Sequence, residues 1–84
     1  MHRILIERTA ERDLKKLPED VFNRIIPIIK SLSGNPRPRG CHKIRTSKND
    51  WRIREGEYRI IYEIDDSAKE VKILRVKHRK DAYR

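Results

Sequence analysis

The chain has 84 residues, the length of one domain, which we assign to residues 1–84. It includes 22 Lys or Arg and 13 Asp or Glu, which gives a formal net charge of +9. Such a charge indicates a polyanionic partner, most simply nucleic acid, although an acidic protein or an anionic membrane surface also fits. The longest apolar run, residues 25–29, is too short to span a bilayer, and we see no signal-peptide core at the N-terminus. We therefore expect a cytoplasmic protein. Its single cysteine, Cys41, can form no internal disulfide, which fits a reducing compartment.

The N-terminal half predicts one short strand followed by two helices. Residues 3–6, Arg-Ile-Leu-Ile, are typical of a short strand. Thr9 can cap a first helix by accepting hydrogen bonds from backbone N–H groups, and the buried face of that helix consists of Ala10, Leu14 and Leu17. A second helix begins after Pro18, and its apolar face consists of Val21, Ile25, Ile28, Ile29 and Leu32. The Ser-Gly-Asn-Pro run at residues 33–36 ends it.

The C-terminal half changes to the period of two that is typical of strands. We expect a short edge strand over 42–45, a hairpin of strands over 51–54 and 58–64, and a last strand over 71–76. Gly56 supplies the backbone freedom that the tight hairpin turn needs. The whole chain therefore predicts an α+β fold, in which two N-terminal helices pack on one face of a small, largely antiparallel twisted sheet.

The hairpin carries the clearest candidate site. Arg52 and Arg54 alternate with apolar residues and must share one face of their strand, and Arg59 returns to that face across the turn. Three guanidinium groups on one face suit a phosphate, because each donates two parallel hydrogen bonds and keeps its charge. A solvent-exposed strand face that only keeps the sheet soluble fits the same pattern.

Other chemistries have weaker support in the residues. His78 could exchange a proton near neutral pH, and Tyr83 offers a ring for stacking, but a surface histidine between Lys77 and Arg79 explains the same pattern. Nothing marks the adjacent Cys41 and His42 as a nucleophile and its base. The three histidines and one cysteine have no metal-ligand spacing, so we expect neither a metal nor another cofactor.

Four segments taken together resemble the RelE/ParE toxin superfamily, and most closely its RelE-like branch. They are L-K-K-L-P at 14–18, N-P-R-P-R-G at 35–40, W-R-I-R-E-G-E-Y-R-I-I-Y at 51–62 and V-K-H-R-K-D-A-Y at 76–83. The resemblance covers essentially the whole chain and implies the RelE-like fold. It also implies the toxin of a type II toxin–antitoxin system, a metal-independent endoribonuclease that cuts mRNA in the ribosomal A site by 2′-OH attack on the adjacent phosphate.

The same resemblance assigns site residues. The basic positions of the family's hairpin match Arg52, Arg54 and Arg59, and its basic and aromatic tail positions match Arg79 and Tyr83. Well-known members carry lysines at the first two positions, and one of these often serves as general base. Arginine is a poor base, so we expect the arginines to hold the phosphate and His78 to transfer the proton.

Partners follow from the resemblance as well. It implies a cognate RelB-like antitoxin, the ribosome and its mRNA, without a membrane. We expect further cations to contact RNA and the ribosome: Lys43, Arg45, Lys48, Lys77, Lys80 and Arg84. A ParE-like inhibitor of DNA gyrase that cleaves nothing remains the alternative function, and a non-catalytic RNA-binding module is a third.

Overall fold

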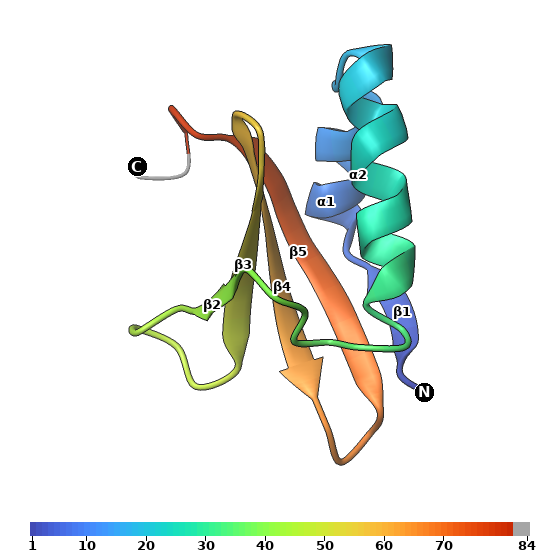
Figure 1. Ribbon diagram of the computed structural model, residues 1–84, viewed down its shortest axis with the longest axis vertical. Helices are drawn as coiled ribbons and strands as arrows, with labels where there is room; N and C mark the ends of the chain where they lie inside the picture. Colours follow the sequence, from blue (N-terminus) through green and yellow to red (C-terminus); the bar gives the residue numbers. More distant parts are fainter. Residues whose placement is uncertain (82–84) are drawn as a thin grey trace.

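The computed structural model describes residues 1–81, which form two helices and a five-stranded sheet (Figure 1). In chain order the elements are β1 (Arg3–Ile6), α1 (Arg8–Lys15), α2 (Glu19–Ser31), β2 (Cys41–Lys43), β3 (Asp50–Glu55), β4 (Tyr58–Asp65) and β5 (Glu70–His78). The strands lie side by side in the order β1-β5-β4-β3-β2. No helix within these residues is long and apolar enough to cross a membrane.

The sheet is mixed, with one parallel pair. β5 runs antiparallel to β4, β4 to β3 and β3 to β2, whereas β1 runs parallel to β5. A parallel pair needs a long connection, and here most of the chain separates its two strands. The α+β class and the largely antiparallel sheet are therefore confirmed, and β2 is an edge strand near the predicted one, over 41–43 instead of 42–45.

Both helices cover the same face of the sheet, and the core lies between them and that face (Figure 1). Apolar residues recur on the helices every three or four positions and on the strands every second position, so each element buries one side. The buried apolar residues of the helical half are Ala10, Leu14, Val21, Ile25, Ile29 and Leu32. Those of the sheet are Ile53, Ile60, Tyr62, Ile64, Val71, Ile73 and Val76. The other face of β3 and β4 is left without a helix.

The start of α1 differs from the expectation. The helix begins at Arg8, with Glu7 at its N-cap position and no side-chain cap. Thr9 lies inside the first turn, and its hydroxyl donates to the carbonyl of Leu74 at 2.9 Å. Thr9 therefore ties the helix to β5 instead of capping it, because an unpaired strand carbonyl at the sheet edge needs a donor.

Candidate active site

The β3–β4 hairpin brings three arginines together on the sheet face that the helices leave open. Arg54 lies directly opposite Arg59 in the antiparallel register, and Arg52 lies two residues before Arg54 on β3. Ile53 and Ile60, the neighbouring pair, are buried in the core on the opposite face. Because successive residues of a strand alternate between faces, the three arginines point away from the helices.

These arginines line a pocket of about 370 Å³, which we call the arginine cleft. Its lining consists of Gly40, His42, Arg52, Arg54 and Arg59. Two residues come from β3, one comes from β4, and the others come from β2 and the residue before it. The cleft is therefore built across three adjacent strands, at the side of the sheet where β2 is the edge.

The register of β2 carries His42 into the cleft. His42 lies opposite Arg52, so both side chains project from the same face of the sheet. The chain reaches this position through a loop that Tyr62 holds, because the Tyr62 hydroxyl donates to the Pro36 carbonyl at 2.8 Å. Gly40 then turns into β2 with a φ of 93°, in the left-handed region that favours glycine. His42 was not among the site residues expected from the sequence.

The carboxylates nearest the hairpin turn form ion pairs with arginines that do not line the cleft. Glu55 pairs with Arg24 of α2 at 3.5 Å, and Glu57 pairs with Arg79 at 3.6 Å. Within residues 1–81, Arg52 and Arg54 have no ion-pair or hydrogen-bond partner for their side chains. Arg59 is the one buried charged residue described. Two guanidinium groups facing an open cleft are placed to bind an anion with a planar, bidentate geometry.

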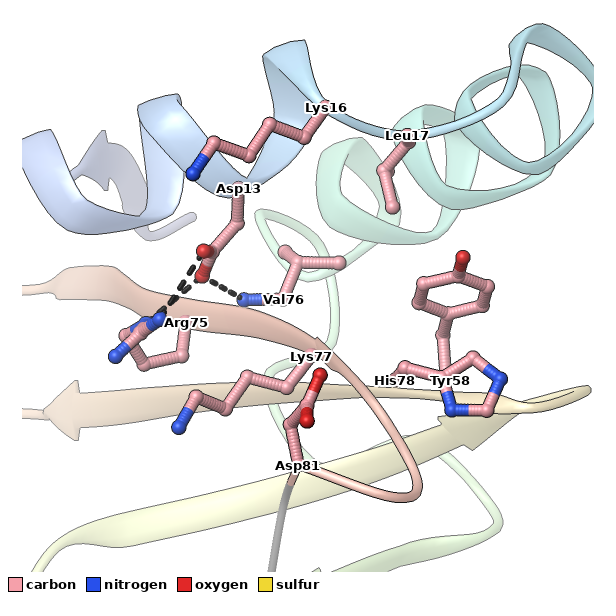
Figure 2. Close-up of a pocket in the computed structure, with 9 residues that line it drawn as sticks. All are labelled: Asp13, Lys16, Leu17, Tyr58, Arg75, Val76, Lys77, His78 and Asp81. Carbon is pink, nitrogen blue, oxygen red and sulfur yellow. Dashed lines mark hydrogen bonds and ion pairs between the residues drawn. The ribbon is translucent and has the colours of Figure 1, made fainter.

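His78 does not line the arginine cleft, and the proton transfer expected of it stays a prediction. Lys77, not His78, lies opposite Arg59 in the register, so strand alternation turns His78 to the other face. There its ring meets the Tyr58 ring edge-on, with 5.2 Å between centroids (Figure 2). A local signal existed in the sequence, since His78 follows the buried Val76 by two residues and shares its face.

Figure 2 shows the second pocket, of about 460 Å³, in which His78 lies. It lies between the end of α1 and the end of β5 and shares no lining residue with the arginine cleft. Across it, Asp13 accepts hydrogen bonds from Arg75 and from the backbone of Val76. Burial alone would raise the pKa of Asp13, but these hydrogen bonds and the charges of Arg75 and Lys77 together lower it. An internal ion pair, between Asp13 and Arg75, forms part of the wall of this pocket, and the sequence did not predict the pocket as a site.

The remaining candidate residues lie around the cleft or outside the described chain. Lys43 is exposed on β2 and donates to the Ser47 carbonyl at 2.8 Å, while Arg45 and Lys48 are exposed on the loop that follows. Arg79 is tied to the hairpin turn, because its backbone N–H donates to the Glu57 carbonyl at 2.6 Å. Lys77 is partly buried opposite Arg59, and Lys80 is exposed. Tyr83 and Arg84 lie outside the described residues.

Comparison with known proteins assigns the family. Residues 4–83 match the model of the ParE toxin of the type II toxin–antitoxin system, parDE. The chain belongs to the RelE/ParE toxin superfamily. Among curated proteins, this toxin is 40% identical over 77 residues to Toxin RelG of Mycobacterium tuberculosis, a match that covers 90% of this chain and 88% of RelG. It is 35% identical to Toxin RelE3 of Methanocaldococcus jannaschii, with 96% and 94% covered. These relatives place it in the RelE-like branch.

Solved structures of the superfamily have the same fold. The toxin–antitoxin complex RelBE2 of Mycobacterium tuberculosis contains a chain that matches with a TM-score of 0.80 and 34% identity, over 92% of this toxin and 96% of that chain. The RelE–RelB complex of Pyrococcus horikoshii matches with a TM-score of 0.83 and 29% identity, over 96% and 98%. The isolated RelE toxin of E. coli, at 19% identity and a TM-score of 0.81, shows the fold alone. The protein is thus a RelE-like toxin of the type II toxin–antitoxin class.

Proposed function

We propose that this toxin is a ribosome-dependent endoribonuclease that cuts mRNA in the A site and so inhibits translation. The observation that carries the proposal is the arginine cleft. Arg52 and Arg54 face it without a carboxylate partner among the described residues, and Arg59 lies beside them. The identity to proteins named as RelE and RelG toxins supports the same activity.

The chemistry suits a cleft of fixed positive charges. When a ribose 2′-OH attacks the adjacent phosphate, negative charge builds on the phosphorane oxygens. Guanidinium groups that project from a sheet into one cleft are placed to stabilise that charge, as donors aimed at developing charge do in other enzymes. Arg52, Arg54 and Arg59 hold the phosphate in this scheme. Arg79, next to the hairpin turn, adds a fourth cation, and Tyr83 stacks on a base or positions it.

Partners follow from the charge and from the relatives. The exposed cations beside the cleft, Lys43, Arg45, Lys48 and Lys80, contact ribosomal RNA, with Lys77 and Arg84 adding to that surface. The solved relatives include complexes of a RelE toxin with a RelB antitoxin. A RelB-like antitoxin encoded with this toxin binds and neutralises it.

The decisive experiment separates mRNA cleavage from inhibition of gyrase. Purified toxin is added to ribosomes carrying a defined mRNA with an empty A site, and primer extension locates any cut. We expect one discrete cut in the A-site codon of the ribosome-bound mRNA and none in the same mRNA without ribosomes. Intact mRNA together with loss of supercoiling by purified DNA gyrase would instead establish the ParE-like alternative.

A further inference from the structure

The arginine cleft can hold a phosphate, but its arginines cannot take a proton at neutral pH. A base that takes the proton of the ribose 2′-OH accelerates its attack, so the proposed reaction would gain from one more residue in or beside the cleft. We infer that His42 is this general base, a role that rests on the proposed endoribonuclease function.

The register places His42 where a base is needed. It is the direct neighbour of Arg52 across the antiparallel β2–β3 pair. Side chains at such opposed positions project from one face, with Cβ atoms about 4.5–5.5 Å apart. His42 and Arg52 also line the same 370 Å³ cleft. A phosphate held by the arginines would therefore lie beside the His42 imidazole.

The rest of the cleft offers no competing base. Among the described residues that line it, the others are three arginines and Gly40, none of which exchanges a proton near neutral pH. Asp50 lies two residues before Arg52 on the same face of β3, yet it is not part of the lining. Histidine is the side chain best suited to accept a proton at physiological pH.

The three histidines differ in what surrounds them. The His2 ring hydrogen-bonds to Asp66 at 3.0 Å. His78 packs against Tyr58, and its Nδ1 accepts the backbone N–H of Lys80 at 3.2 Å. Within residues 1–81 the exposed His42 ring has no hydrogen-bond or ion-pair partner, so both of its nitrogens are open to a substrate. Of the three, His42 alone lines the arginine cleft.

The step balances without a metal or other cofactor. One nitrogen of neutral His42 takes the proton of the 2′-OH as the bond between that oxygen and phosphorus forms. The bond between phosphorus and the 5′-oxygen of the next nucleotide breaks, and the departing oxygen takes a proton from water. The products are a 2′,3′-cyclic phosphate and a 5′-OH end, and the imidazolium returns its proton to solvent.

The test uses single-turnover cleavage of mRNA on programmed ribosomes. His42→Ala should cut about 10²–10⁴-fold more slowly than the wild type, the usual contribution of a general base. Added imidazole should restore part of the rate, which the loss of a merely structural residue would not allow. His42→Asn, which keeps a similar shape, should be equally slow. His2→Ala, which removes a histidine that does not line the cleft, is the matched control and should cut at the wild-type rate.

Two further measurements separate the possible outcomes. Binding of ribosomes carrying a 2′-deoxy A-site nucleotide should be unchanged in His42→Ala, because the base acts on the reaction and not on binding. His42→Ala should also be slow to cut a substrate that has sulfur in place of the leaving 5′-oxygen. If the variant cuts this substrate at the wild-type rate, His42 acts as the acid that protonates the leaving oxygen and the inference is wrong. Undiminished cleavage by His42→Ala overturns the inference and leaves the function standing, whereas a wild type that cuts nothing overturns both.

Discussion

Asp13 on α1 binds Arg75 on β5 through both carboxylate oxygens, with the Nε and Nη2 atoms of Arg75 at 2.8 and 3.1 Å. One of these oxygens also accepts the backbone N–H of Val76 at 2.9 Å. β1 pairs with β5 up to Ile73, so this carboxylate satisfies the sheet edge where β1 has ended. A single side chain thereby joins the helical layer to the strand that carries His78.

Removing that carboxylate should destabilise the fold. Asp13→Ala leaves the Val76 N–H and the Arg75 guanidinium without their acceptor, which costs about 1–3 kcal/mol of the free energy of unfolding. For a domain of this size, each kcal/mol lowers Tm by about 4–8 °C. Urea unfolding and calorimetry measure both quantities. Asp20→Ala, which breaks the exposed i,i+4 pair with Arg24 and removes a first-turn acid of α2, is the control and should cost less, about 1 kcal/mol at most. An equal loss of the free energy of unfolding in the two variants would contradict the role of Asp13 in satisfying the edge of the sheet beyond β1.

The same carboxylate should make stability depend on acid pH. The pKa of Asp13 is lowered in the folded state from its ordinary value of 3.8, since the hydrogen bonds and cations around it outweigh its burial. A lowered folded pKa adds stability that is complete above the unfolded value and is lost as the pH falls towards the folded one. Urea unfolding from pH 6 down to pH 2 should therefore show that the free energy of unfolding falls below about pH 4. In Asp13→Asn this fall should be shallower. If the variant has the same pH dependence as the wild type, Asp13 does not contribute to it.

Single arginines of the cleft should matter for cleavage and not for folding. Arg52→Ala and Arg54→Ala each remove a cation that faces the cleft, so single-turnover cleavage should fall by about 10²–10³-fold. Lysine at either position should recover part of this rate, because its ammonium keeps the charge without the bidentate geometry. Tm should stay within a few degrees of the wild type, since neither side chain has a partner among the described residues. Arg12→Ala, which removes an exposed charge from α1, should cut normally.

The cations beside β2 should set the salt dependence of ribosome binding. Replacing Lys43, Arg45 and Lys48 by alanine should weaken binding and make the plot of log affinity against log salt shallower, by about 0.7–0.9 for each RNA phosphate that the variant no longer neutralises. Filter binding or sedimentation across a salt series measures the slope. A triple variant with the same charge change on the helices, at Arg8, Arg12 and Lys30, should leave the slope unchanged. A slope altered equally by both variants would mean that net charge, and not this surface, drives binding.

The Tyr62 hydroxyl should stabilise the loop that leads to the cleft. Burial, with Cys41 nearby, raises the pKa of Tyr62, so the hydroxyl stays protonated and donates to Pro36. Tyr62→Phe removes that donor and should cost about 1 kcal/mol of the free energy of unfolding. Tyr58→Phe is the control and should be close to neutral, because the Tyr58 hydroxyl has no hydrogen-bond partner in residues 1–81. Greater hydrogen exchange at residues 36–42 in Tyr62→Phe alone would locate the effect.

Local patterns in the sequence were enough to predict the two helices, the hairpin and the shared face of Arg52 and Arg54. Alternation of faces is a property of any strand, and a tight turn at Gly56 returns the chain beside itself. The same alternation, counted from the buried Val76, places His78 on the face away from the arginines.

Tertiary structure alone decided what joins those elements. Asp13 and Arg75 are 62 residues apart, and no local pattern pairs them. β2 is three residues long and reaches β3 through a loop, so the sequence does not tell whether Cys41, His42 or Lys43 lies opposite Arg52. That register depends on how the preceding loop packs on the sheet, and a shift of one residue would turn His42 to the opposite face. The sequence was therefore enough to predict the basic face of the sheet, whereas only the tertiary structure identified His42 as the candidate base among the described residues that line the cleft.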